Sequence, residues 1–220
     1  KPYSRPLQYA DIMILLRKRT HVWAYEQALL EQRIPYLSAD RGKLLDALEI
    51  GDLIALLQYL HTPLHDLALA RILKSPIFSC TDEDLILLAQ TAGNHWTDKM
   101  IRASQNTLPR TSLHRATRLL GEWRKMVGRI PVHDLLDLIY DQANIIDRYT
   151  AAFPQHMRLR VRANLTRFLE LALEIDSGRY PSLGRFLQRL NLRQNIDNEG
   201  IDEAKDDYSE QRVKLYTIHG

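Results

Sequence analysis

The segment that most constrains the fold lies at the end of the sequence. Residues 212–220, RVKLYTIHG, predict a short buried β-strand that leads into a Thr-Ile-His-Gly turn. The backbone groups of a buried strand need hydrogen-bonding partners, and strand-like apolar runs also occur at residues 11–16 (DIMILL) and 34–37 (IPYL). Val213 is therefore expected to begin a strand that joins the sheet of residues 11–16.

Both ends of the sequence are expected to lie inside a longer polypeptide. Residues 1–6 do not resemble an initiator sequence, and no further element follows the strand that begins at Val213. The function of this chain is then expected to be one part of the function of a larger protein.

Composition indicates an ordinary soluble globular protein with one large domain or two small ones. The 220 residues are 45% hydrophobic and 26% charged. The longest charge-free apolar run, residues 53–60, is too short to span a bilayer. Cys80 is the single cysteine of the sequence, so no disulfide can form within it, and a reducing cytoplasm is the expected location.

Charge is distributed unevenly, although the formal net charge is only +3. Residues 156–195 contain eight arginines and three acids, whereas residues 197–210 contain seven acids and one base. The acidic stretch is expected to be an unordered loop, because like charges repel and bury little surface. Arg158 and Arg162 lie one helical turn apart. Their face could be a solvated surface or a contact for DNA.

The chain begins with a strand, a helix over residues 22–32 and a second strand, which predicts a parallel βαβ unit. Ligands bind beyond the carboxyl ends of such strands, and Arg17 directly follows the first one. Residues 93–109 are expected to be irregular or weakly helical. Helices are predicted at residues 44–60, 67–73, 85–88 (after a Thr81 cap), 113–126, 132–142, 157–175 and 183–192.

The overall prediction is a mainly α protein with a small parallel β-sheet. An α/β piece comes first, an all-helical insert follows, and the chain returns to the sheet at Val213. No strand pattern is found between residues 111 and 211.

Several patterns for catalysis or metal binding do not fit. A phosphate-binding Walker loop is absent, since Gly42 and Lys43 are followed by a leucine. His61, His65 and Asp66 have helix-like spacing but are interrupted by a proline, so a metal site is not expected there. Cys80 is expected to be a small buried apolar residue.

Two residues have both a functional and a plain interpretation. Arg17 could be a solvated arginine at a strand end, or an arginine that stabilises charge on a transferring phosphoryl group. His219 could be a turn residue with satisfied ring nitrogens, or a hydrogen-bond donor to a phosphate oxygen.

Four groups of segments together resemble the second motor half of the UvrD/Rep-type DNA helicases, most closely its nuclease-linked branch with the RecB and AddA subunits. Residues 5–7 with 11–17 resemble helicase motif IV, and residues 25–36 resemble the helix and strand that follow it. Residues 48–60 with 73–76 resemble motif IVa and its helix pair, and residues 213–220 resemble the start of motif V.

The resemblance implies a domain organisation. Residues 1–108 would form a partial RecA-like α/β domain, called 2A in the family, and residues 109–208 would form its helical insert, called 2B. Residues 209–220 would return to 2A as the start of motif V. The Walker motifs would lie upstream, so ATP and Mg²⁺ would be cofactors of the parent protein, and none is expected for this chain alone.

The resemblance also implies residue roles. Arg17, in motif IV, would reach the ATP γ-phosphate as a catalytic and nucleotide-binding residue. The family often has tyrosine before this arginine; here it is Leu16, so adenine stacking is not expected from this position. Glu49, in motif IVa, would be a nucleotide-side or structural residue. Thr217 and His219 would lie near the single-stranded DNA backbone.

The function implied is ATP-dependent DNA unwinding, as part of a helicase or helicase-nuclease used in recombination and repair. Its partners would be single-stranded and duplex DNA, the first motor domain of the same polypeptide and other subunits of a complex. The isolated segment is expected to be inactive. One alternative is a helicase-derived helical module that binds a partner protein. Another is an unrelated helical protein, in which the strand at Val213 would lack a role.

Overall fold

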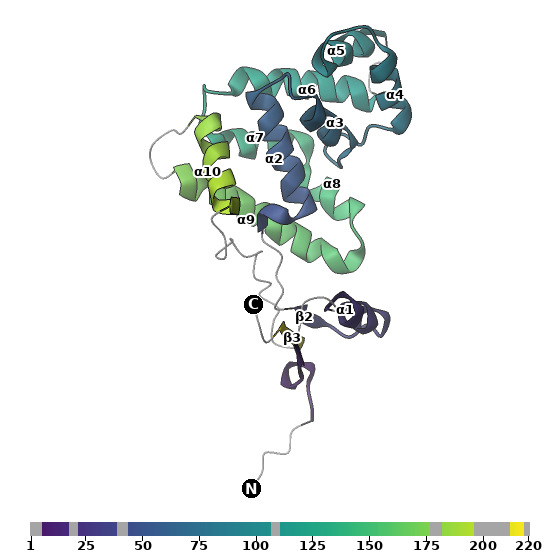
Figure 1. Cartoon of the computed structure of the whole chain (residues 1–220), viewed down its shortest axis with the longest axis vertical. Helices are drawn as coiled ribbons and strands as arrows, with labels where there is room; N and C mark the ends of the chain where they lie inside the picture. The colour runs from purple at the N-terminus through teal and green to yellow at the C-terminus, as the bar shows by residue number, and fades with distance from the viewer. Residues whose placement is uncertain are drawn as a thin grey trace. The chain divides into compact units, whose positions relative to one another are not determined.

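The computed structural model describes residues 6–17, 22–38, 44–106, 111–176, 182–195 and 212–217. The chain divides into two compact units (Figure 1). One unit consists of Lys1–Gly42 with Lys205–Gly220 and the other of Lys43–Ala204. The predicted acidic loop at 197–210 and His219 lie outside the described residues.

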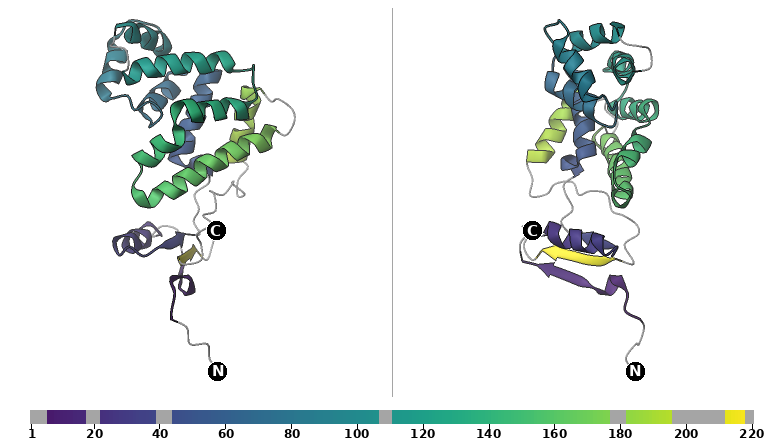
Figure 2. Two further views of the ribbon diagram at one scale, coloured as in Figure 1. Left: turned by 180° about the vertical axis from the view of Figure 1, so that it is seen from behind. Right: turned by 90° about the vertical axis from the view of Figure 1, so that its right-hand side faces the viewer.

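The smaller unit contains a parallel sheet whose middle strand is the last in sequence. Its strand order is β1 (Met13–Leu16), β3 (Val213–Thr217), β2 (Tyr36–Ser38), which is visible in the right-hand view of Figure 2. The backbone N–H groups of Val213 and Lys214 donate to carbonyls on opposite sides, those of Pro35 and Ile12, at 3.0 Å each. The last strand therefore joins the sheet of residues 11–16, as the sequence predicts, and separates β1 from β2.

One face of this sheet forms a small apolar core with α1 (Val22–Glu31). Leu16, Val213 and Leu215 are buried there, and Leu29 of α1 packs against them. Residues of β1 alternate between the two faces, and Leu15 is 59% exposed on the opposite face. The predicted strand at 11–16 begins two residues late because η1 (Tyr9–Asp11) is a 3₁₀ turn, in which Asp11 accepts from the Gln8 N–H.

The larger unit is helical and is built around α2 (Leu48–His61), which runs between helices on several sides (Figure 1). The apolar run at residues 53–60 has no polar face, so α2 requires partners all round. Those partners are α3 (Asp66–Lys74), α6 (Ser112–Met126), α9 (Arg158–Asp176) and α10 (Leu183–Asn195). The remaining elements are η3 (Leu44–Asp46), α4 (Asp82–Gln90), α5 (Trp96–Asn106), α7 (Val132–Ala143), α8 (Ile145–Ala152) and η4 (Gln155–Met157).

Helix starts follow the local sequence. Thr81 accepts from the Asp84 N–H at 3.2 Å, and the Asp84 carboxylate accepts from the Thr81 N–H at 2.9 Å. This reciprocal pair is a capping box, and it confirms the helix start predicted at Thr81. Thr111 caps α6 with a single side-chain hydrogen bond, accepting from the His114 N–H at 3.2 Å.

Two parts of the helical unit go beyond the prediction. Residues 96–106, expected to be irregular or weakly helical, form α5, because burying Met100 and Ala103 against neighbouring helices stabilises a segment with few apolar residues. Helix α8 was not predicted, since neither glycine nor proline separates it from α7. Asn144 makes that break with a left-handed backbone, φ 49°, a conformation that asparagine tolerates better than most residues.

The predicted limit near residue 108 does not coincide with the compact units. Helices on both sides of it contribute to one hydrophobic core, which contains Leu56 and Ile72 as well as Trp123 and Phe168. The reason is that α2 is apolar all round and takes part of its cover from α6, α9 and α10. The assignment of residues to 2A and 2B remains a prediction about the family.

The two helix-interior glycines Gly51 and Gly121 provide a matched test of packing. A Cβ on Gly51 would fall on the guanidinium of Arg71, which donates to Asp52 at 2.8 Å, whereas a Cβ on Gly121 meets nothing within 4 Å. We expect Gly121→Ala to raise the free energy of unfolding by about 0.5–1 kcal/mol. Gly51→Ala should lower it by about 1 kcal/mol, because the buried Asp52 loses its charged partner. Chemical denaturation measures both, and equal stabilisation would contradict the packing at Gly51.

Candidate functional site

The carboxyl edge of the sheet brings together two residues that the sequence analysis selected. Arg17 directly follows β1, and Thr217 ends β3 in register with Leu16. The two residues therefore lie at the ends of neighbouring parallel strands, where such sheets bind ligands. The Arg17 side chain is exposed. The guanidinium of Arg17 could therefore bind an anion at this edge of the sheet.

Leu16 has a different environment from Arg17, although the two are adjacent in sequence. Leu16 is only 9% exposed and belongs to the small apolar core with Val213 and Leu215. A side chain in this position fills the core and is not available to stack on a base.

Glu49 lies in α2, inside the helical unit. It is 4% exposed, and its carboxylate accepts a hydrogen bond from the Asn164 amide of α9 at 2.8 Å. Burial, together with the negative charge of Glu49, raises the pKa of Tyr140 above its ordinary value. These contacts join α2 to α9 and give Glu49 a structural role. A nucleotide-side role for Glu49 remains a prediction.

A second buried carboxylate, Asp52, lies one turn further along α2. It accepts from the Arg71 Nε of α3 at 2.8 Å and from the Tyr149 hydroxyl of α8 at 2.9 Å. Burial raises the pKa of Tyr149, and the charge and hydrogen bond of Asp52 raise it further. The signal in the sequence is a pair of acids at i and i+3 within an otherwise apolar helix, which indicates buried polar partners.

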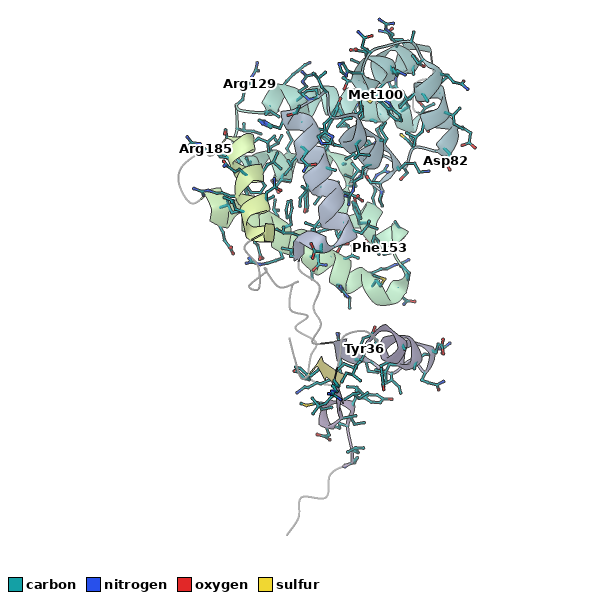
Figure 3. The ribbon with its side chains drawn as sticks, in the orientation of Figure 1. Tyr36, Asp82, Met100, Arg129, Phe153 and Arg185 are labelled. Carbon is teal, nitrogen blue, oxygen red and sulfur yellow. The ribbon has the colours of Figure 1, made fainter. Side chains whose placement is uncertain are left out.

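The arginines near the start of α9 lie on its exposed side. Arg158 and Arg162 are exposed. Arg158 also donates to the carbonyl of Phe153 at 3.1 Å, and Phe153 lies where α8 meets α9 (Figure 3). Arg167, further along the helix, is paired with Glu170 and Glu174. Within the described part of the chain, Arg158 and Arg162 have no comparable carboxylate within 4.0 Å.

Two of the three residues considered as metal ligands, His65 and Asp66, accept hydrogen bonds from the backbone. The Nδ1 of His65 accepts from the Ala68 N–H at 3.2 Å at the start of α3, and Asp66 accepts from the Trp96 N–H at 3.0 Å. Among the residues that the structure describes, no group of three His, Cys, Asp or Glu side chains could hold a metal ion. Cys80 is 4% exposed, and burial raises the pKa of its thiol to about 12. This confirms Cys80 as a buried apolar residue.

The chain is a mainly α protein in which a large helical unit interrupts a small parallel sheet in sequence. The sequence matches the family model of the UvrD-like helicase C-terminal domain over residues 3–220, and the chain belongs to this family. The match confirms the resemblance drawn from the helicase motifs. Searched over its described residues, the structure has no helix long and apolar enough to cross a membrane.

The chain is similar to part of several helicase-nuclease proteins. It is 27% identical to an ATP-dependent helicase/nuclease subunit of Listeria monocytogenes serotype 4b, over 98% of this chain and 18% of that protein. It is 30% identical to the corresponding ATP-dependent helicase/nuclease protein of Lactococcus lactis subsp. lactis, over 95% of this chain and 18% of that protein. The exonuclease/helicase subunit RexA of Lactococcus lactis subsp. cremoris is 29% identical, with the same two shares. The chain thus spans 18% of the length of these relatives.

The pairing of Glu49 with Asn164 leads to a stability prediction. We expect Asn164→Ala to lower the free energy of unfolding by about 1–3 kcal/mol, because the buried carboxylate loses its hydrogen-bond donor. Glu49→Gln should have a smaller effect, since the amide oxygen can still accept from Asn164. Urea denaturation of the two variants checks this order, and a larger loss for Glu49→Gln would contradict the structural role.

Proposed function

We propose that this chain is part of an ATP-dependent DNA helicase, in the form of a helicase-nuclease subunit that works in the cytoplasm. The proposal is supported by one observation above others: in a member of the UvrD-like helicase C-terminal family, Arg17 lies exposed at the carboxyl edge of a parallel sheet, beside the end of β3. The chain would supply one wall of an ATP cleft and part of a DNA track. The names of its relatives include helicase and nuclease activity.

Arg17 would act on the phosphates of ATP. Its guanidinium stays charged at neutral pH and can form two parallel hydrogen bonds to phosphoryl oxygens. Charge that develops on a transferring phosphoryl group is stabilised by such an arginine. Because Arg17 follows a strand whose other residues are anchored in the sheet, movement of the sheet would move the guanidinium. ATP hydrolysis would then be coupled to opening and closing of the cleft.

DNA would contact both units of the chain. Thr217 and His219 belong to the segment that resembles motif V and would lie near the single-stranded backbone. Arg158 and Arg162 are exposed on α9 and would contribute positive charge toward phosphates. Residues 1–108 with 209–220 would form the 2A domain, and residues 109–208 would form the 2B domain. Glu49 would belong to the 2A domain and lie on its nucleotide side.

Arg17→Gln tests the nucleotide role, with Arg33→Gln as its matched control. Arg33 is also exposed in the smaller unit, but it precedes β2 and therefore lies toward the amino edge of the sheet. In the full-length protein we expect Arg17→Gln to lower the kcat of DNA-stimulated ATP hydrolysis by about 10³-fold or more. Arg33→Gln should leave it unchanged.

Equal ATP hydrolysis by the wild type and Arg17→Gln would refute the role of Arg17. Residues 1–220 alone should hydrolyse no ATP, since they contain no Walker lysine. Activity of that segment that disappears in Arg17→Ala would show that the ATP site lies within the chain itself.

The α9 arginines are tested by the salt dependence of DNA binding. Each lost phosphate contact should reduce the slope of log K against log salt by about 1. We expect the double variant Arg158→Gln with Arg162→Gln to lower this slope by about 2. Arg167→Gln should not change the slope, because Arg167 already pairs with Glu170 and Glu174. Fluorescence anisotropy with labelled DNA measures the slopes, and identical slopes for all proteins would exclude this face from the DNA contact.

A further inference from the structure

Two arginines from different helices meet at one turn of the helical unit. The turn, residues 75–80, connects α3 to α4. Arg115 of α6 donates through one guanidinium nitrogen to the Ile77 carbonyl at 2.7 Å, and Arg148 of α8 donates to the adjacent Pro76 carbonyl at 3.4 Å. The two acceptors are consecutive residues, and the charge of Arg148 lowers the pKa of Arg115, so the two guanidinium groups lie near each other. We call them the arginine pair.

Arg115 is held in place from several directions. A second nitrogen of Arg115 donates to the Ala143 carbonyl at 3.3 Å, and its guanidinium carbon lies 5.9 Å from the centre of the Phe78 ring. The turn itself is closed by the Cys80 N–H, which donates to the Leu73 carbonyl at 2.8 Å. A guanidinium fixed in this way loses little conformational entropy when a ligand binds.

The positive charge of the arginine pair is not neutralised inside the chain. Both guanidinium groups bond to neutral carbonyls, and among the described residues neither forms an ion pair with a carboxylate. Partial burial lowers the pKa of Arg115, and the charges of Arg148 and Arg118 lower it further. Arg118 differs from the pair, since it has Glu122 as a partner at 3.1 Å. Two like charges that are held together without a counter-ion favour an anion as ligand.

The donors that remain indicate which anion would bind. A guanidinium has five N–H donors, and in these contacts Arg115 uses two and Arg148 one. The donors left over belong to planar groups that recognise phosphate oxygens in pairs. Both side chains are half-buried, so they remain accessible to a ligand at the surface.

We propose that Arg115 and Arg148, together at the turn of residues 75–80, form a binding site for a phosphate of the nucleic-acid backbone. This inference rests on the proposed function, because it requires that the protein binds DNA. It adds a contact that is separate from the α9 arginines and from the sheet edge at Arg17. Sequence reasoning did not find it, since the two arginines belong to different helices and only packing brings them to one turn.

Arg148→Gln in the full-length protein tests the site, with Arg185→Gln as its control. Arg148 forms a single, long hydrogen bond, so its replacement should leave the fold intact, which a thermal melt checks. Arg185 is exposed on α10, away from the turn, and its loss removes the same charge (Figure 3). The probe is a fluorescein-labelled DNA duplex with a single-stranded tail, titrated at several salt concentrations. We expect Arg148→Gln to reduce the salt slope by about 1 and Arg185→Gln to leave it unchanged.

Other outcomes would overturn the proposal. A folded Arg148→Gln protein with the wild-type slope, or an equal reduction in both variants, would exclude a specific phosphate site. If Arg148→Gln binds ATP more weakly and the salt dependence of its DNA binding is unchanged, the arginine pair binds a nucleotide and the proposal is wrong. If Arg148→Gln does not fold, Arg148→Lys keeps the charge and loses the planar group. It should then lose DNA affinity at fixed salt, and wild-type affinity would refute the site.

The failure of this inference can be distinguished from the failure of the proposed function. If the wild-type protein does not bind the labelled DNA at all, both are wrong. If the wild-type protein binds and only the effect of Arg148→Gln is missing, DNA binding stands and this inference alone is wrong.

Discussion

The helical unit depends on the burial of two carboxylates within one apolar helix. A buried charge is strongly unfavourable unless it is paired, so Glu49 and Asp52 of α2 require partners at fixed positions. In chain order from α3 to α9, those partners are Arg71, Tyr149 and Asn164. Hydrophobic burial alone would tolerate several packings of these helices. The hydrogen bonds of the two carboxylates select the one in which α3, α8 and α9 all meet α2.

Because Glu49 and Asp52 are buried, fewer carboxylates remain at the surface to pair with its arginines. Glu49 and Asp52 are satisfied within the core, and they do not compensate positive charge outside it. Several arginines are therefore left exposed or bonded only to carbonyl oxygens, among them Arg17, Arg162 and Arg148. A protein whose formal net charge is only +3 can in this way present local sites that attract phosphate.

The sequence predicted most of the fold, because its strongest patterns are local. The strands and the long apolar helix follow from runs such as residues 11–16 and 53–60, and the position of Arg17 at a strand end follows from them. Helix α5 depends on tertiary contacts, which a pattern of residues does not contain. The break at Asn144 is a local left-handed turn that neither glycine nor proline marks. The meeting of Arg115 with Arg148 was missed because it results from packing between distant segments.

The position of β3 has a consequence for the order in which the chain can fold. Among the residues that the structure describes, β1 and β2 are not paired with each other, and each pairs with β3. During synthesis, both outer strands leave the ribosome long before Val213 does, and the whole helical unit is made between them and their partner. The ladder can form only after that long connection has been closed, at an entropic cost that rises slowly with its length. The helical unit can therefore acquire its core first, and the pairing of β1 and β2 with β3 waits until Val213–Thr217 has been made.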